Sequence, residues 1–197
     1  GFPDPEDPPE ARYIAATCGG VRVAGVYVPN GRTPQDPHYE YKLAWLHALA
    51  GHLAPVAASG TPFAVLGDFN VAPTDADVWD IAQFANSTHV TPAEREALAD
   101  LRSIGLTDVM PRALKGEPYT FWDYRAAAFG RGFGMRIDLV YANAAFAAAV
   151  SDAGFGWQWT TRAFTAHASS ARPARGIVHA RRGWRCRSRR GPTNWCG

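Results

Sequence analysis

The stretch FAVLGDFNVAPTDADVWD, from Phe63 to Asp80, contains the pattern that decides the fold of this chain. A run of apolar and small residues ends at Gly67, and Asp68 and Asn70 follow with one residue between them. Alternate residues of an extended chain point to the same face of a sheet, so the pattern predicts that Asp68 and Asn70 address one ligand at a strand end. The competing interpretation is a turn, because Asp and Asn side chains often bond nearby backbone after a strand.

The residues before this stretch predict two strands and a helix. YIAATCGGVRVAGVYVPNG, from Tyr13 to Gly31, contains two apolar runs around Gly19 and Gly20, which is typical of a β-hairpin. The next segment, YEYKLAWLHALAGHLAPVAAS from Tyr39 to Ser59, predicts a helix with Pro55 in or near its end. Its leucines follow the spacing of one helical face: Leu43, Leu46, Leu49 and Leu53. A helix between strands favours an α/β arrangement in this part of the chain.

The second half of the chain begins with a well-marked helix. In TPAEREALADLRSIG, Thr91 is the expected N-cap, Glu94 completes a capping box and Gly105 is the expected stop. An aromatic and basic stretch then leads through a glycine-rich loop into a strand that contains Asp138. Asp75 and Asp77, between the two halves, are interpreted as capping or loop residues.

Two polar residues besides Asp68 and Asn70 are candidates for chemistry. An ionised Asp138 inside an apolar strand is costly unless it is paired or bound to a cation, and the alternative is a structural partner such as an arginine or backbone donors. Tyr27 lies near a strand end and is either functional or a core tyrosine. Carboxylate and amide oxygens suit Mg²⁺, and Mg²⁺ beside an aspartate suits phosphoester hydrolysis. The sequence shows no zinc-type spacing, no Walker-type loop and no Gly-x-Ser-x-Gly elbow.

The aromatic segment bears on the substrate. Stacking faces and phosphate-seeking charges alternate there, which suits DNA whose base stack is disturbed. The alternative is an aromatic cluster packed on the core. The candidate DNA-binding residues are Trp122, Tyr124, Arg125, Arg131 and Arg136, together with Phe121.

Composition places the chain among globular proteins. It has 197 residues, of which 47% are hydrophobic and 19% charged, enough for one domain with a core. No apolar run matches a membrane span or a signal peptide, so we expect a soluble, cytoplasmic protein. Three cysteines, Cys18, Cys186 and Cys196, predict no disulfide framework.

The charge is distributed unevenly. Residues 1–153 contain all 18 acidic and 11 basic residues, a net charge of −7, whereas residues 154–197 contain nine arginines and no acid. A basic tail on an acidic body is typical of a nucleic-acid-binding arm. The alternative is that the tail is encoded out of frame, because its composition is that of GC-rich DNA translated in another frame. From about residue 160 we expect no regular packing.

Five motifs, in this order, resemble the exonuclease III family, the apurinic/apyrimidinic endonuclease branch of the endonuclease/exonuclease/phosphatase superfamily. They are GVYVPNG, VLGDFNVAPTD, GLTDVMP, YTFWDYR and GMRIDLVYAN, and they cover residues 1 to about 152. The resemblance implies an α+β fold, part of a four-layer αββα sandwich with mixed β-sheets. It also implies Mg²⁺-dependent hydrolysis, with Mn²⁺ as a possible substitute, of double-stranded DNA at 3′ ends (3′-to-5′ exonuclease) and at abasic sites, by a monomer.

The resemblance also implies roles for individual residues. Asp68 corresponds to the residue that activates the attacking water, and Asn70 to the stabiliser of the phosphate, both near the metal. Tyr27 corresponds to the tyrosine that contacts the scissile phosphate. Asp138 corresponds to the carboxylate that orients a catalytic histidine. Trp122 lies in the segment that probes DNA near the lesion.

The chain departs from the family pattern at both ends. The family's amino-terminal part, with an Asn and a metal-binding Glu, has no counterpart here, and neither has its terminal Ser-Asp-His motif. His167 follows Ala166 without the acid. We therefore expect residues 1–152 to be the central and carboxy-terminal part of the domain, and residues 153–197 to be a non-matching tail. The expected activity is that of an impaired nuclease fragment. The alternatives are a non-catalytic remnant that binds DNA weakly, and a phosphatase for small phosphoesters, which FWDYR disfavours.

Overall fold

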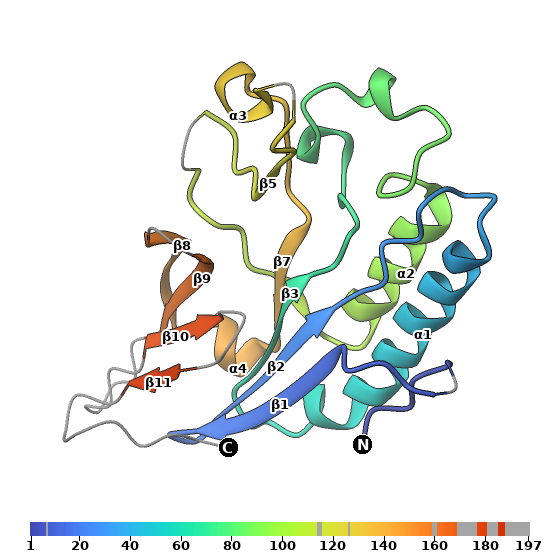
Figure 1. The fold of residues 1–197 in the computed structure, drawn as a ribbon. Coiled ribbons are helices and arrows are strands. Elements are labelled where there is room, and N and C mark those ends of the chain that lie inside the picture. The colour runs from blue at the N-terminus through green and yellow to red at the C-terminus, as the bar shows by residue number, and fades with distance from the viewer. Residues whose placement is uncertain are drawn as a thin grey trace.

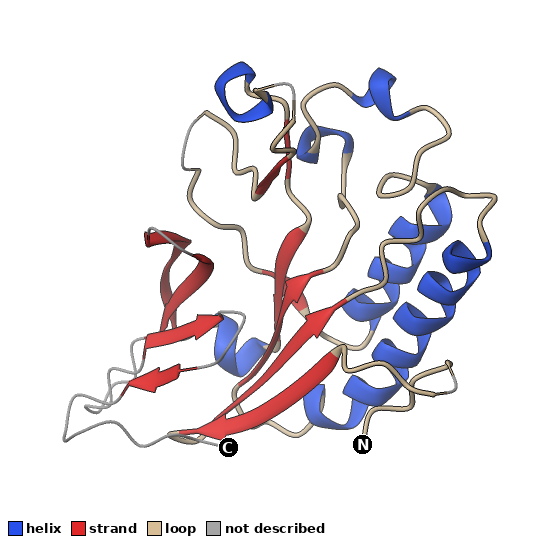
Figure 2. Ribbon diagram, in the orientation of Figure 1, coloured by secondary structure: helices blue, strands red, loops and turns tan. Residues whose placement is uncertain are grey.

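The computed structural model describes residues 1–6, 8–113, 116–125, 127–158, 161–168, 177–180 and 185–187 (Figures 1 and 2). The helices are α1 (Pro37–Ala57), η1 (Asp75–Asp77), η2 (Ile81–Phe84), α2 (Pro92–Ser103), α3 (Ala128–Arg131) and α4 (Ala144–Ala147). The strands are β1 (Tyr13–Cys18), β2 (Val21–Tyr27), β3 (Phe63–Asp68), β4 (Thr107–Asp108), β5 (Phe121–Trp122), β6 (Gly134–Met135), β7 (Asp138–Ala142), β8 (Val150–Gln158), β9 (Thr161–Ala168), β10 (Ile177–Ala180) and β11 (Arg185–Arg187). Within these ranges no helix is both long enough and apolar enough to span a bilayer.

The main sheet is mixed and has the strand order β1-β2-β3-β7-β4. The predicted hairpin is confirmed, since β1 and β2 pair antiparallel around Gly19 and Gly20, which have φ of 57° and 84°. Two successive positive φ values match the twist of a two-residue hairpin turn. The long helix α1 then returns the chain so that β3 pairs parallel with β2.

Local capping signals account for the helix boundaries. Asp36 caps α1 by accepting a hydrogen bond from the His38 amide at 2.9 Å. Pro55 lies inside the last turn of α1, as predicted. The capping box of α2 is confirmed, with reciprocal bonds between Thr91 and Glu94. These bonds satisfy amide groups that have no partner within the helix.

The buried face of α1 differs from the predicted leucine stripe in one position. Leu43 is only half-buried, and Lys42 is fully buried instead. Lys42 lies three to four residues from its neighbours on the same face, so it shares the helical spacing of the leucines. The buried residues of α1 are Tyr39, Lys42, Trp45, Leu46, Leu49, Ala50 and Leu53.

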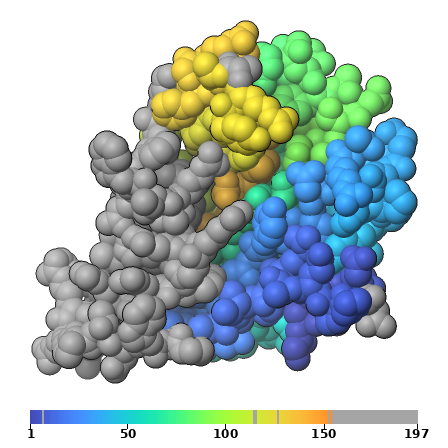
Figure 3. All heavy atoms as spheres, viewed as in Figure 1, coloured from blue at the N-terminus to red at the C-terminus, as the bar shows by residue number. Residues whose placement is uncertain are grey.

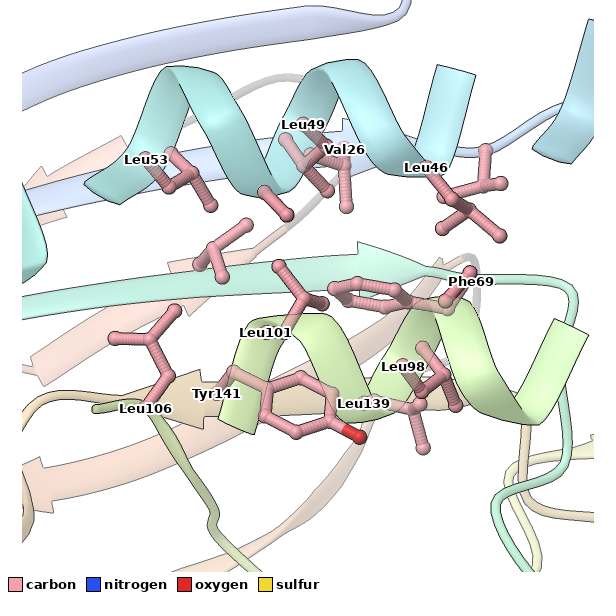
Figure 4. Packing of buried hydrophobic residues seen from close by; sticks show 14 of the residues in the cluster. Val26, Leu46, Leu49, Leu53, Phe69, Leu98, Leu101, Leu106, Leu139 and Tyr141 are labelled. Atoms are coloured by element: carbon pink, nitrogen blue, oxygen red, sulfur yellow. The ribbon is translucent and has the colours of Figure 1, made fainter. Parts of the chain in front are cut away.

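The main core lies between the sheet and the helix pair α1 and α2 (Figure 4). Figure 4 shows α1 and α2 on opposite sides of the view, with side chains from both helices and from β2, β3 and β7 between them. The labelled members are Val26, Leu46, Leu49, Leu53, Phe69, Leu98, Leu101, Leu106, Leu139 and Tyr141. A second cluster covers the other face of the sheet, where Phe146 of α4 and Ala153 of β8 pack on β2, β3 and β7.

The helices and the mixed main sheet confirm the predicted α+β class. A second sheet has the order β11-β10-β9-β8 and is antiparallel throughout. Its strands β9, β10 and β11 lie in the region where the sequence predicted no regular packing. Backbone pairing therefore extends to residue 187. The side-chain packing of that region, including Trp184 and Trp195, lies outside the described residues, and the origin of the tail stays a prediction.

Candidate functional site

Three predicted site residues form one row at one end of β2, β3 and β7, the three middle strands of the main sheet. Tyr27 ends β2 and pairs with Asp68, which ends β3, and Asp68 pairs with Asp138, which begins β7. Directly paired residues lie on the same face of a sheet. Their sequence neighbours Val26, Phe69 and Leu139 belong to the core under α1 and α2, so the row faces away from those helices.

Asp68 follows a glycine that the close approach of β2 and β3 requires. Gly67 has φ of +144°, and a Cβ at this position would lie 2.0 Å from the carbonyl oxygen of Val26. Only glycine avoids this clash with the backbone of the neighbouring strand. The small residue before the carboxylate thus allows β3 to end beside Tyr27.

Asp138 lies at the first residue of β7 and is half-buried. The sequence predicted that Asp138 lies inside an apolar strand, but the strand begins at Asp138 itself. The hydroxyl oxygen of Thr120 accepts hydrogen bonds from the amides of Ile137, at 3.0 Å, and Asp138, at 2.9 Å. The β5 region thereby holds the backbone on which the carboxylate stands.

Asn70 is joined to Asp68 by a hydrogen bond rather than by strand alternation. The strand ends at Asp68, and Asn70 has a left-handed φ of 52°. Its amide donates to Asp68 Oδ1 at 2.9 Å, so the turn interpretation describes the backbone. The Asn70 side chain itself is held by residues that follow β2. Asn70 Nδ2 donates to the Val28 carbonyl at 2.9 Å, and Asn70 Oδ1 accepts from Asn30 Nδ2 at 3.1 Å.

A buried ion pair that the sequence analysis missed lies beneath Asn70. Lys42 Nζ donates to the carbonyl of Asn70 at 2.7 Å, to the carbonyl of Asn30 at 3.1 Å and to the carboxylate of Glu94. Neither side chain of the pair is exposed to solvent. Burial lowers the pKa of Lys42, and the Glu94 carboxylate opposes this effect. A lysine at the leucine spacing of α1 was the sequence signal for this pair.

Glu94 has two functions, of which the capping box is only one. One carboxylate oxygen accepts from the Thr91 amide at 2.9 Å, and the other accepts from Thr88 Oγ1 at 2.6 Å and from the His89 amide at 2.9 Å. A capping glutamate normally faces solvent, so the capping motif alone did not indicate that this one binds a buried lysine.

His89 also contacts Asn70. Its Nδ1 lies 2.6 Å from the Asn70 carbonyl oxygen, and a carbonyl only accepts, so Nδ1 carries the hydrogen. Burial, together with the charge of Lys42, lowers the pKa of His89 to about 4. The ring is therefore neutral near pH 7.

Tyr27 is exposed to solvent, and its ring contacts an arginine that lies just before β1. Its side chain is 48% exposed, which excludes the core-tyrosine interpretation. The Arg12 guanidinium lies 5.1 Å from the centre of the Tyr27 ring and donates to the Tyr27 carbonyl at 3.2 Å. This arrangement holds the ring by a cation–π contact at the edge of the row.

The predicted DNA-binding residues divide into an exposed and a buried group. Tyr124 is 87% exposed, Arg125 and Arg131 are exposed, and Arg131 stacks on Phe133 with 4.2 Å to the ring centre. The 116–135 segment lies beside the 71–91 segment at one end of the molecule (Figure 3). Trp122, in contrast, is buried and packs edge-on against Phe129, as in the aromatic-cluster alternative.

Arg136 is a correction to the predicted DNA-binding set. It is 2% exposed, and its guanidinium pairs with Asp77 at 2.6 Å and with Asp108 at 2.9 Å. A buried guanidinium that serves two carboxylates is not available to a phosphate. Asp77, which the sequence analysis interpreted as a capping residue, caps η1 and also pairs with this arginine.

The donor chemistry at Asp68 fits a hard cation. Among the described residues, no group of three or more His, Cys, Asp or Glu side chains lies close enough to hold a metal ion. Mg²⁺ does not need such a cage, since one or two carboxylates with waters and substrate phosphates usually hold it. The opposed carboxylates of Asp68 and Asp138 repel each other, and a nearby cation would offset this repulsion.

The chain is similar to members of one known protein family. Residues 1–186 match the Endonuclease/Exonuclease/phosphatase family. This match extends beyond residue 152, where the sequence analysis placed the end of the domain. An exodeoxyribonuclease of Bacillus subtilis is 29% identical over 147 residues, which are 73% of this chain and 57% of that protein.

Two groups of solved structures share the fold. The 3′-5′ exonuclease NExo of Neisseria meningitidis is 38% identical with a TM-score of 0.73, over 79% of this chain and 61% of that one. A second structure of NExo from Neisseria holds a product DNA hairpin. An AP endonuclease of Archaeoglobus fulgidus is 31% identical with a TM-score of 0.71, over 79% of this chain and 62% of that one. The chain thus spans less than two thirds of each of these relatives.

Proposed function

Because this chain belongs to the endonuclease/exonuclease/phosphatase family, we propose that it carries the catalytic sheet face of a DNA-repair nuclease of the exonuclease III type. The proposed reaction is Mg²⁺-dependent hydrolysis of phosphodiester bonds in duplex DNA, at abasic sites and at 3′ ends. The row formed by Tyr27, Asp68 and Asp138 is the observation that carries this proposal. The names of the relatives, an exodeoxyribonuclease and an AP endonuclease, support it.

Each member of the row and Asn70 has a proposed task. The Asp68 carboxylate accepts a proton from the attacking water. An amide nitrogen carries two hydrogens, and Asn70 donates one to Val28, so the second is the proposed donor to a phosphate oxygen. The Tyr27 hydroxyl is the proposed donor to the same phosphate. Asp138 is the proposed orienting carboxylate. Oxygens of Asp68 and Asn70 are the proposed ligands of Mg²⁺, which when bound polarises the phosphate.

The proposed DNA contact uses the loops at the end of the molecule that carries α3. Tyr124 offers a stacking face, and Arg125 and Arg131 offer charge to phosphates. Trp122 is proposed to support this segment from beneath, since it packs against Tyr119 and Phe129. The expectations of a monomer and of a cytoplasmic location stay predictions.

An incision assay tests the proposed reaction. We expect the 197-residue chain to incise an abasic duplex slowly, because within the described ranges Asp68 is not joined by two further metal-ligating side chains. The incision should require Mg²⁺ and stop with EDTA. The measurement is a single-turnover assay with protein in excess over a labelled abasic oligonucleotide. Incision that persists in EDTA would contradict the metal-dependent mechanism, and DNA binding without any incision would favour the non-catalytic alternative.

A binding assay tests the DNA surface. Replacing Arg125 with Ala is expected to weaken binding to duplex DNA and to lower the slope of log Kd against log salt by about 1, because one phosphate contact releases about one counterion. Arg102→Ala, on the exposed side of α2, is the matched control and should leave the slope unchanged. Fluorescence anisotropy over a salt series measures the affinity and the slope. Equal slopes in the two variants would show that Arg125 does not contact DNA phosphates.

A further inference from the structure

Asn70 stands in a backbone conformation that needs external support. Its φ of 52° lies in the left-handed region, which is unfavourable for a residue other than glycine. Asn tolerates this region better than most residues, but the conformation persists only when neighbouring groups fix it. Asn70 is 4% exposed, so protein groups rather than solvent provide that support.

Two side chains hold the Asn70 carbonyl from different elements. Lys42 of α1 donates to it at 2.7 Å, and His89, in the loop before α2, donates to it at 2.6 Å. A carbonyl oxygen has two lone pairs, so these donors use its full accepting capacity. Lys42 is itself fixed by Glu94, by Thr88 Oγ1 at 3.1 Å and by the Asn30 carbonyl.

The two donors act on the peptide unit that follows the side chain proposed to bind phosphate. Rotation of that unit would change ψ of Asn70 and move its Cα substituents relative to Asp68. The Asn70 amide also donates to Asp68 Oδ1, so a shift of Asn70 would release one oxygen of the proposed catalytic carboxylate. Hydrogen bonds thus connect the buried ion pair to Asn70 and, through the Asn70 amide, to Asp68.

We propose that Lys42 and His89 are positioning residues that clamp the Asn70 carbonyl and thereby orient the Asn70 amide and the Asp68 carboxylate for the phosphate. This inference rests on the proposed function for the tasks of Asn70 and Asp68. The clamp itself is a property of the folded chain, and it is measurable without any substrate. Neither residue touches the phosphate in this proposal.

The experiment compares two clamp variants with a control of similar stability cost. His89→Asn removes the ring donor, keeps the Lys42–Glu94 pair and tolerates the left-handed φ of 82° at this position. Lys42→Met removes the second donor. Leu49→Ala, in the apolar core face of the same helix, destabilises the protein without touching Asn70. The first readout is NMR: the ¹³C′ resonance of Asn70 and the solvent exchange of its side-chain amide hydrogens.

The clamp predicts an upfield ¹³C′ shift and faster amide exchange at Asn70 in both clamp variants and not in Leu49→Ala. If Lys42→Met does not fold, His89→Asn decides this readout. Equal changes of the Asn70 signals in Leu49→Ala would overturn the clamp, since general loosening would then explain them. Unchanged Asn70 signals in His89→Asn would overturn it as well.

The second readout is the Mg²⁺-dependent incision of abasic DNA. His89→Asn is expected to lower kcat on the order of tenfold to a hundredfold with KM for DNA unchanged, because a small misplacement of a catalytic group slows the chemical step. A shifted Asn70 resonance with unchanged kcat would overturn the positioning role and leave the proposed function intact. Failure of the proposed function would appear differently, as incision that is indifferent to Asp68→Asn, while the NMR result would still decide the clamp.

Discussion

Asp68→Asn is expected to lower the rate of Mg²⁺-dependent incision by a factor on the order of 10³ or more. An amide has almost the shape of a carboxylate but takes no proton from water, and it is a weaker ligand for a hard cation. The position of the side chain should change little, because Gly67 and the pairing with β2 and β7 set it. The loss should therefore appear in kcat rather than in the affinity for DNA.

Asp100→Asn provides the matched control for this prediction. This variant makes the same carboxylate-to-amide change on the outer side of α2, where the Asp100 side chain is 43% exposed and contacts His47. Its incision rate should equal that of the unchanged protein. Single-turnover rates of the three proteins decide the matter, and an Asp68→Asn protein that incises at the unchanged rate would remove Asp68 from the mechanism.

Arg136→Met is expected to lower the free energy of unfolding by about 3–5 kcal/mol, because removal of one partner leaves buried charge uncompensated. Two carboxylates depend on this guanidinium. Asp77 is 4% exposed and Asp108 is only partly exposed, and burial already raises the pKa of Asp108 against the opposing effect of Arg136. Methionine keeps the approximate length of the side chain, so the loss of charge dominates the effect.

Two further variants separate this effect from a simple loss of packing. Arg95→Met removes an arginine whose partner Asp75 is 64% exposed, and it should cost about 1 kcal/mol or less. Adding Asp77→Asn to Arg136→Met should recover part of the lost stability, since one stranded charge is removed. Urea unfolding followed by circular dichroism measures all three. An equal cost for Arg95→Met and Arg136→Met would show that the burial of Arg136 with Asp77 and Asp108 contributes nothing to stability.

Much of the fold follows from signals that lie within a few residues of each other. Two adjacent glycines make the β1–β2 hairpin, and Thr91 with Glu94 sets the start of α2. Such signals act through local backbone geometry, and tertiary contacts change them little. Two residues of the candidate row, Tyr27 and Asp68, likewise stand at strand ends as the sequence predicted.

Other features needed the folded chain, because they depend on partners far away in sequence. Lys42 and Glu94 are 52 positions apart, and Arg136 and Asp77 are 59 apart. A charged residue in a sequence is normally assigned to the surface, since burial of an unpaired charge is costly. Only the packing of α1 on α2, and of the β6–β7 turn on η1, supplies the opposite charges that make burial possible.

The amino-acid sequence alone therefore specified the β1–β2 hairpin, α1, β3 and α2, and it placed Tyr27 and Asp68 at strand ends, because hydrophobic periodicity and capping are local. It did not specify which of those residues are exposed, how they are held, or that Asn70 turns out of the strand. Strand register places Tyr27, Asp68 and Asp138 in one row. Side-chain packing buries Arg136 and Trp122, which the sequence had assigned to the DNA-binding surface. Register and burial are sums over contacts between distant segments, so only the tertiary structure decides them.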